Sequence, residues 1–485
     1  MTKNKQHKLP KLVKQGLYDP SFEHDACGVA MIANIKGVKN HDIIKKGLEA
    51  LEHLGHRGAA GADPKTGDGA GIMTQIPDAI FRNELKKDLP PLDDYAVGMV
   101  FLPAQKTDRD ICIKLIEESI LDESMQLIKW REVPVNPNSI GNTAKDSMPY
   151  ISQFFVTPKS SLKEDEFEFS LFALRRIIEK KIDRSNISED DFYICSLSKN
   201  TVVYKGLLMT DQVRKFYLDL QNESFISSLA LVHSRFSTNT LGSWRLAHPY
   251  RYVIHNGEIN THRGNVNWMS AREKVFDTQN NNKDISKLIP IIKEGQSDTA
   301  SLDNALELLL STGRSIEHSM MMLIPEAWGD HIPMSEEKKS FYEYHSSMME
   351  PWDGPALVIG TDGKKVCAVL DRNGLRPCRY LVTSDDLLVM GSETGIIDVD
   401  DKKILYKERI YPGRMFLLDT EKGEIINDTE LKDVLSNRTS YSKWLKENRV
   451  FIEDLPNPTN IVKNEPETLI NRQNAFGYSL EDIRM

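Results

Sequence analysis

The sequence lacks any apolar run approaching the ~20 residues that a helix needs to cross a bilayer. It also lacks an excess of positive charge, because 62 Lys and Arg are outnumbered by 71 Asp and Glu, giving a net charge of −9. Binding a phosphate backbone requires clustered basic residues, so this composition disfavours a nucleic-acid-binding protein. With 40% hydrophobic residues over 485 positions, the chain is predicted to be soluble and globular, with about three domains.

The N-terminal segment lacks both arginine and an apolar stretch, which excludes a secretory signal and argues against a transit peptide. It is polar, contains several lysines and shows no apolar periodicity. We interpret residues 1–26 as a flexible leader.

Cysteine is scarce, and the chain contains neither a CxxC nor an HExxH motif. An odd number of cysteines at unrelated spacings is not a disulfide framework, and it offers no zinc or iron–sulfur ligand set. We therefore expect a cytoplasmic location and no metal in this chain. The five cysteines are Cys27, Cys112, Cys195, Cys367 and Cys378.

Apolar periodicity predicts a mixed α/β protein with at least two sheets. A helix is expected over 41–54, with Gly55 as its C-terminal cap. After about residue 430 the chain becomes polar and loses its strands, with Pro456 and Pro458 marking a linker. Strands are expected at 95–102, 149–156, 191–204, 228–233 and 251–255 and throughout 355–418, and helices at 107–121, 164–182 and 262–276.

A glycine-rich run occupies residues 56–71 and contains neither GxxxxGK[ST] nor GxGxxG. Its glycines permit positive φ angles and close approach of the backbone to a ligand. Taken alone, the run is equally compatible with a ligand site and with a solvent-exposed loop.

Two polar segments each follow a strand-like apolar run, at 233–240 and at 255–260. Polar residues just past a strand end often form binding sites on a rigid scaffold. The alternatives are that Asn256-Gly257 is a hairpin turn, for which it is the strongest two-residue signal, and that Arg235 is a surface ion-pair partner.

Cys27 opens the first strand directly after the leader. A cysteine in an apolar strand is usually an inert core residue. Removal of the leader would instead give Cys27 a free α-amine, which titrates near ~7.7–8.0 and is able to accept the thiol proton.

Cys27-Gly28-Val29, His56-Arg57-Gly58 and the Thr66–Gly71 run resemble the class II glutamine amidotransferases, which have an N-terminal cysteine. Within that family, the sequence is similar to the glutaminase domain of the glutamate synthase large subunit. The resemblance covers 27 to about 430, and the segment near 474–482 looks like the opening of the family's next domain. Further matching motifs lie at 233–240, 244–260, 263–268, 297–301, 325–328, 351–355 and 371–377.

The resemblance implies an α+β fold, a four-layer αββα sandwich of the N-terminal-nucleophile hydrolase type. It implies a propeptide at 1–26, an amidotransferase domain at 27–430, and a linker with the start of a truncated or absent domain at 431–485. The implied catalytic residues are Cys27 as the nucleophile and Asn256 and Gly257 as the oxyanion hole.

For substrate binding, Arg57 and Arg235 match residues that line the glutamine pocket, with Arg235 as the carboxylate clamp. Asp298 matches the acceptor of the substrate ammonium, and we expect it to be unpaired until that group binds.

The function implied is hydrolysis of L-glutamine to L-glutamate and ammonia through a cysteinyl thioester, with the ammonia passed to a synthase domain or subunit. In the family, FMN and an iron–sulfur cluster reside on that synthase part, and we expect neither in this chain. The chain is expected to work in an oligomer or complex. The alternatives are a glutaminase feeding another acceptor, as in amidophosphoribosyltransferase-like proteins, and a non-catalytic glutamine-binding module.

Overall fold

The structure is a computed structural model that describes residues 26–60, 63–236, 242–274, 285–456 and 465–485. Nearly all of the expected leader, residues 237–240 of the first polar segment, and Pro458 lie outside the described residues. Within the described ranges, no helix combines the length and the hydropathy required to cross a bilayer.

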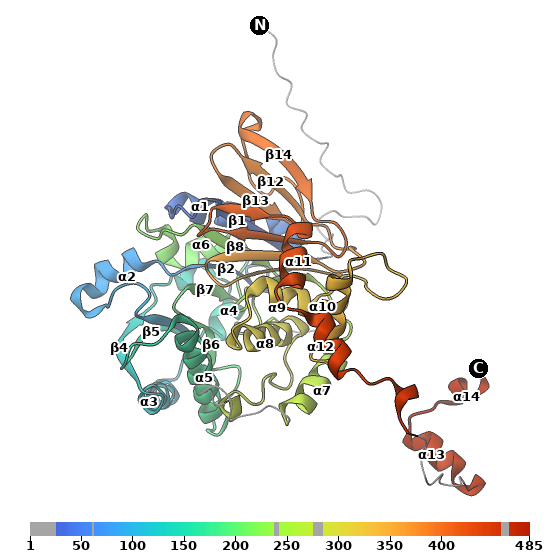
Figure 1. Ribbon diagram of the computed structural model, residues 1–485. Helices are drawn as coiled ribbons and strands as arrows, with labels where there is room; N and C mark the ends of the chain where they lie inside the picture. Colours follow the sequence, from blue (N-terminus) through green and yellow to red (C-terminus); the bar gives the residue numbers. More distant parts are fainter. Residues whose placement is uncertain (1–25, 61–62, 237–241, 275–284, 457–464) are drawn as a thin grey trace, which may run out of the picture.

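Two antiparallel sheets form the centre of the fold (Figure 1). The seven-stranded sheet has the order β14-β12-β13-β1-β8-β2-β7, and the five-stranded sheet has the order β16-β15-β11-β10-β9. The strands of the first sheet are β1 (Gly28–Asn34), β2 (Ala70–Gln75), β7 (Thr201–Gly206), β8 (Leu229–Ser234), β12 (Arg379–Thr383), β13 (Leu387–Gly391) and β14 (Ile404–Arg409). Those of the second are β9 (Val253–Gly257), β10 (Ala356–Thr361), β11 (Lys365–Leu370), β15 (Met415–Asp419) and β16 (Glu424–Ile426).

Helices cover the outer faces of both sheets. Helix α1 (His41–His53) packs on β1 and β8, while α8 (Asp298–Ser311) and α9 (Ile316–Leu323) pack on β9 and β11. One hydrophobic core joins α1 and both sheets, and a second core lies between the five-stranded sheet and its helices. The expected four-layer αββα order is therefore confirmed.

A third sheet is formed by the part of the chain that lies between β2 and β7 in the sequence. Its order is β4-β5-β3-β6, and α3 and α5 cover it over a separate hydrophobic core. The single strand expected at 191–204 is thus wrong, because β6 belongs to this sheet and β7 to the seven-stranded one. The elements are β3 (Ala96–Leu102), β4 (Met125–Glu132), β5 (Tyr150–Pro158), β6 (Tyr193–Ser198), α3 (Lys106–Asp122) and α5 (Glu164–Asp183).

Of the remaining helices, α2, α4 and α6 contribute to the first core, α7, α10, α11 and α12 contribute to the second, and α13 and α14 lie at the C-terminal end. Helices α11 and α12 pack on α10, whereas α13 and α14 extend away from the body of the fold (Figure 1). The bounds are α2 (Asp78–Leu85), α4 (Asn142–Asp146), α6 (Gln212–Phe216), α7 (His262–Glu273), α10 (Glu336–Ser346), α11 (Asp428–Asn437), α12 (Tyr441–Asn448), α13 (Leu469–Ala475) and α14 (Leu480–Arg484).

Helix α1 begins as its sequence predicts but ends differently. The Asn40 side chain accepts a hydrogen bond from the Ile43 amide at 3.0 Å, which caps the first turn. The end does not use Gly55 as a left-handed cap, because fully buried Leu54 donates its amide back to the last turn and the chain continues as a 3-10 turn over Leu54–Arg57. The predicted glycine cap is therefore wrong.

Glu168 of α5 gives the fold a pH-dependent contribution to stability. Its Oε1 accepts hydrogen bonds from Ser198 Oγ and the Lys199 amide, both at 3.1 Å. Burial raises the pKa of Glu168 from 4.5 to about 7 despite these bonds. The folded chain therefore holds this proton more tightly than the unfolded chain, and stability decreases as pH rises through that window.

Glu168→Gln stays neutral at every pH, so we expect its Tm relative to the parent chain to increase between about pH 5 and about pH 8. Differential scanning calorimetry of both chains in matched buffers measures this difference. A Tm difference that stays constant across the range would contradict the prediction.

Candidate active site

Cys27 lies where β1 begins and β8 ends. The two strands are antiparallel, with Gly28 opposite Ser234, so the residue before β1 lies beside the residues that follow β8. The Cys27 thiol donates to the Phe236 carbonyl at 3.5 Å, and the Phe236 amide donates to Cys27 Sγ at 3.4 Å. This reciprocal pair holds the thiol, partly exposed, at the ends of two central strands of the seven-stranded sheet.

The electrostatics keep this thiol protonated. Burial raises the pKa of Cys27 to about 11, outweighing the Phe236 amide and the positive charge of Arg235, which lower it. The negative charges of Asp298 and Glu258 raise it further. While residue 26 is attached, the nitrogen of Cys27 is an amide and not a base, so in this form the thiol has no α-amine to accept its proton.

The pairing of β9 with β10 determines where the Gly257 amide points. The Tyr252 carbonyl accepts from Thr361, and the Glu258 amide donates to Pro355, so even-numbered residues of β9 hydrogen-bond to β10. The odd-numbered residues, including Gly257, direct their backbone groups away from β10. Because β9 is the edge strand of its sheet, the Gly257 N–H is not used in the ladder.

Position 257 also requires a glycine. Its φ is +134°, and a Cβ atom there would lie 1.9 Å from the Pro355 carbonyl oxygen. Asn256-Gly257 is thus the end of a strand paired with a segment far along the chain. The hairpin-turn alternative is wrong.

The Asn256 side chain faces the inter-sheet layer. Ile254, two residues earlier on the same face of β9, is in the core shared with the seven-stranded sheet. Asn256 is buried, and its Oδ1 has no hydrogen-bond partner among the described residues. A buried amide atom without a partner is costly unless a ligand satisfies it, so this position is suited to polar contact with a substrate.

Arg235 is supported by the glycine-rich run. Its amide donates to the Gly69 carbonyl at 2.9 Å and its Nη1 to the Asp68 carbonyl at 3.2 Å. Gly69 has φ +132°, and a Cβ there would lie 2.9 Å from the Ala247 side chain. Residues 66–71 of the run are mostly buried and position an arginine, so this part is not a solvent-exposed loop, whereas His56, Ala60, Pro64 and Lys65 of the same run are exposed.

Asp298 lies in the first turn of α8. Its Oδ2 accepts from the Ile259 amide at 2.9 Å, and its Oδ1 accepts from the Thr299 amide at 2.7 Å and from Thr299 Oγ1 at 3.2 Å. The expectation that Asp298 is unpaired is therefore wrong, because the loop after β9 and the start of α8 both supply donors. The helix N-terminus further favours its negative charge.

The Arg57 side chain forms an ion pair with the carboxylate of Glu393. Its Nε and Nη2 donate to Glu393 Oε2 at 3.1 and 2.8 Å, and His56 Nε2 lies 2.7 Å from the other oxygen of that carboxylate. The base of the Arg57 side chain lies beside Gly28, since a Cβ on that glycine would approach Arg57 Cβ to 3.2 Å. The structure thus brings Arg57 next to β1 with its side chain directed to Glu393.

Three further buried polar residues lie next to these groups, in segments that the sequence analysis identified without giving these residues a role. His233 Nε2 lies 2.8 Å from the His255 carbonyl, which joins β8 to β9 across the two sheets. His255 Nδ1 lies 2.9 Å from Thr299 Oγ1. His255 directly precedes Asn256, Thr299 directly follows Asp298, and His233 lies two residues before Arg235. The sequence signal was their place in the polar segments 233–240 and 255–260 and in the matching motif at 297–301.

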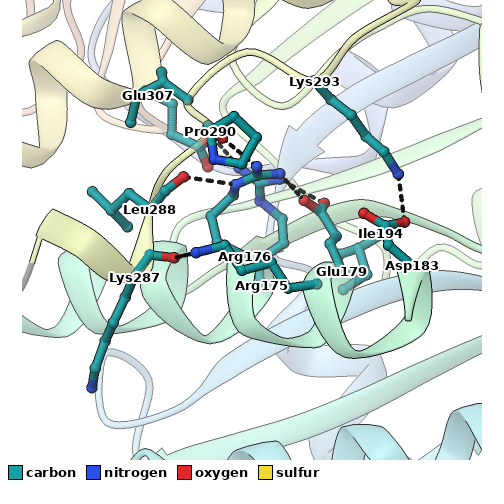
Figure 2. Close-up of polar contacts among 12 residues, drawn as sticks. Arg175, Arg176, Glu179, Asp183, Ile194, Lys287, Leu288, Pro290, Lys293 and Glu307 are labelled. Atoms are coloured by element: carbon teal, nitrogen blue, oxygen red, sulfur yellow. Dashed lines mark hydrogen bonds and ion pairs between the residues drawn. The ribbon is translucent and has the colours of Figure 1, made fainter. Parts of the chain in front are cut away.

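A buried network of ion pairs between α5 and α8, which the sequence did not predict, lies next to the same region. Figure 2 shows Arg175 and Arg176 of α5 between Glu179 and Glu307, with both arginines paired to Glu179. Despite burial, these arginines and Arg251 hold the pKa of Glu179 below its ordinary value.

The network reaches the start of β9 through Asp303. Asp303 of α8 accepts the Arg251 amide at 3.2 Å and the Tyr252 amide at 2.8 Å, and Arg251 Nη2 lies 3.5 Å from Glu179. Because these contacts join α5, α8 and the segment entering β9, they fix the position of α8 relative to β9.

The described residues contain no group of three or more His, Cys, Asp or Glu side chains placed to hold a metal ion. All five cysteines lie within the described ranges as free thiols.

Comparison with known proteins connects this geometry with a family. The sequence profile described as glutamine amidotransferases class-II matches residues 27–444 and so begins at Cys27. The chain is 49% identical to the glutamate synthase [NADPH] large chain of Bacillus subtilis, over 99% of this chain and 31% of that protein. It is 41% identical to ferredoxin-dependent glutamate synthase 2 of Synechocystis, over 96% of this chain and 30% of that protein.

The chain thus spans about a third of the length of these relatives. Among solved structures, the allosteric regulatory enzyme of purine biosynthesis matches at 14% identity and a TM-score of 0.34, over 83% of this chain and 49% of that one, which is too distant to support an argument. The profile match alone covers most of the sequence. This chain belongs to the class-II glutamine amidotransferases.

Proposed function

We propose that this chain is the glutaminase part of a glutamate synthase, which hydrolyses L-glutamine to L-glutamate and ammonia. The observation that carries the proposal is the position of Cys27 at the start of β1, beside Arg235 and within electrostatic reach of Asp298. A thiol, a cation and an anion around one point match the amide, carboxylate and ammonium of glutamine. The identity with glutamate synthases of two organisms supports the choice of acceptor reaction.

In the first half-reaction, the α-amine of Cys27 takes the thiol proton and Sγ attacks the side-chain amide carbon of glutamine. The carbonyl oxygen becomes negative, and the Gly257 N–H and the Asn256 amide group stabilise it. The protonated amine then gives its proton to the leaving nitrogen, so the C–N bond breaks, ammonia leaves and a γ-glutamyl thioester remains.

In the second half-reaction, water attacks the thioester carbonyl carbon while the same amine takes a proton from that water. The C–S bond breaks, the thiol regains its proton and glutamate is released. Arg235 holds the substrate carboxylate, Asp298 accepts the substrate ammonium, and Arg57 lines the pocket.

We further propose that removal of residues 1–26 creates the active form. The attached form holds the Cys27 thiol protonated with an amide nitrogen beside it, and cleavage converts that nitrogen into a base with a pKa near ~7.7–8.0. In this proposal, residues 1–26 are a propeptide that keeps the thiol inactive until it is removed.

The ammonia acceptor in this proposal is a synthase domain or subunit that carries FMN and an iron–sulfur cluster. The sequence-based division of the chain into 1–26, 27–430 and 431–485 stays a proposal in outline. The packing of α11 and α12 on α10 and the family match to 444 favour moving the end of the amidotransferase domain from 430 to a point after α12. Helices α13 and α14 extend from the body, and Phe476 and Tyr478 in the turn between them are exposed, which supports contact with a further part of the enzyme. A cytoplasmic location fits the five free thiols.

Intact mass spectrometry combined with 6-diazo-5-oxo-L-norleucine, a glutamine analogue that alkylates nucleophiles, tests this function. We expect a mature chain that begins at Cys27 and gains one adduct, on that residue, with protection by excess L-glutamine. A chain that retains Met1 or Thr2 and is not labelled would favour the non-catalytic glutamine-binding alternative. Labelling at Cys27 without support of glutamate formation by the whole synthase would favour a glutaminase feeding another acceptor.

A further inference from the structure

A chain of hydrogen bonds runs from β9 to the carboxylate of Asp298. His255 Nδ1 lies 2.9 Å from Thr299 Oγ1, which in turn lies 3.2 Å from Asp298 Oδ1. The His255 and Thr299 side chains are both 3% exposed, so water does not compete for these contacts. Because Asn256 directly follows His255, the chain begins next to the oxyanion group and ends at the ammonium acceptor.

The direction of each hydrogen bond follows from the available protons. The Asp298 carboxylate is an acceptor only, so the Thr299 hydroxyl donates its one proton to Oδ1. The Thr299 oxygen must then accept from His255, which places the His255 proton on Nδ1. Burial lowers the pKa of His255, so the ring is neutral and carries this one proton.

The backbone of His255 is fixed from the opposite side. Its carbonyl accepts from His233 Nε2 at 2.8 Å, so His233 carries its proton on that nitrogen. Burial lowers the pKa of His233 to about 3, which keeps this ring neutral as well. The ring of His248 stacks on His233 with centroids 4.2 Å apart and restricts its rotation.

The consequence is an Asp298 side chain held in one orientation. Thr299 supplies two donors to Oδ1, and the Ile259 amide supplies one to Oδ2. These contacts occupy the protein side of the carboxylate, and a carboxylate has about four acceptor sites in all. The remaining acceptor capacity is available to a bound ammonium group.

We propose that His255 and Thr299 are positioning residues that make the site selective for amides bearing an α-ammonium, by orienting Asp298 toward that group. The inference rests on the proposed glutaminase function. Without the Thr299 hydroxyl, Oδ1 loses a donor and His255 Nδ1 loses its acceptor. Only the Thr299 and Ile259 amides then hold the carboxylate, so its orientation at the ammonium position is less restricted. Binding of a substrate that lacks the α-amino group does not depend on that orientation.

The test compares L-glutamine with glutaramate, which is glutamine without its α-amino group. Thr299→Val removes the hydroxyl and preserves the side-chain shape, whereas Thr299→Ser keeps the hydroxyl. Mature chain whose mass begins at Cys27 is assayed together with the rest of the synthase, and released ammonia is measured for both amides. In a second pair, His255→Asn retains a nitrogen donor near the Nδ1 position and His255→Leu does not.

We expect Thr299→Val to raise KM for glutamine by ~10-fold or more, with kcat within ~3-fold and kcat/KM for glutaramate within ~3-fold. The ratio of kcat/KM for glutamine to that for glutaramate thus falls by ~10-fold. Thr299→Ser keeps more of this selectivity than Thr299→Val, and His255→Asn keeps more than His255→Leu. Equal losses with both amides, or a serine variant as unselective as the valine variant, would overturn the inference and leave the proposed function intact. Absence of ammonia release from either amide by the unaltered enzyme would overturn both.

Discussion

Cys27→Ala is expected to abolish glutamine hydrolysis, lowering the rate by ~10⁴-fold or more, because no other group can form the thioester. The fold should persist, since alanine loses only the two weak sulfur contacts with Phe236, at a cost of about 1 kcal/mol. Glutamate formation from glutamine gives the rate, and circular dichroism with thermal unfolding reports on folding.

Two comparisons make this result specific. Cys112→Ala replaces a fully buried cysteine of α3, so we expect a lower Tm with normal hydrolysis. Encoding residue 27 directly after the initiator Met removes any dependence on leader cleavage in the Cys27→Ala chain. Substantial hydrolysis by that chain would eliminate Cys27 as the nucleophile and, with it, the proposed mechanism.

Asn256→Ala is expected to lower kcat by ~10²–10³-fold with little change in KM. The side chain faces the layer that contains the start of β1, and a donor placed at a developing oxyanion acts mainly in the transition state. Steady-state kinetics with glutamine measure both constants.

Asn265→Ala provides the matched control. Asn265 of α7 is also a buried amide, but its Nδ2 donates to the Pro351 carbonyl at 3.0 Å. We expect that variant to lose stability without a large change in kcat. If Asn256→Ala instead raises KM and leaves kcat unchanged, Asn256 binds the ground state and the oxyanion role is wrong.

The sequence predicts those parts of the fold that local pattern determines. The apolar spacing over 41–54 predicts helix α1 and its buried face, which the structure places at His41–His53. The split of 191–204 between two sheets could not be predicted, because β6 and β7 are both apolar and only tertiary pairing distinguishes their sheets. Gly55 likewise follows the rule for helix ends, and burial of Leu54 overrides it.

For the site, the sequence identifies residues but not their contacts. Cys27, Arg235 and Asn256 stand out because each is polar or reactive beside an apolar strand. The hairpin interpretation of Asn256-Gly257 fails because the pairing partner, β10, lies far along the chain. The Asp298 donors and the Arg57–Glu393 pair depend on loops that only the assembled sheets bring together.

The long-range pairing of β9 with β10 also determines when the site forms. The strand that carries Asn256 finds its neighbour only after α7, α8, α9 and α10 have been synthesised, since β10 begins at Ala356. Contacts of such wide sequence separation form late in folding, because the loop-closure entropy must be overcome first. Cys27 therefore leaves the ribosome long before β9 has its partner strand. If the proposed function holds, we expect no nascent chain that ends before β10 to hydrolyse glutamine.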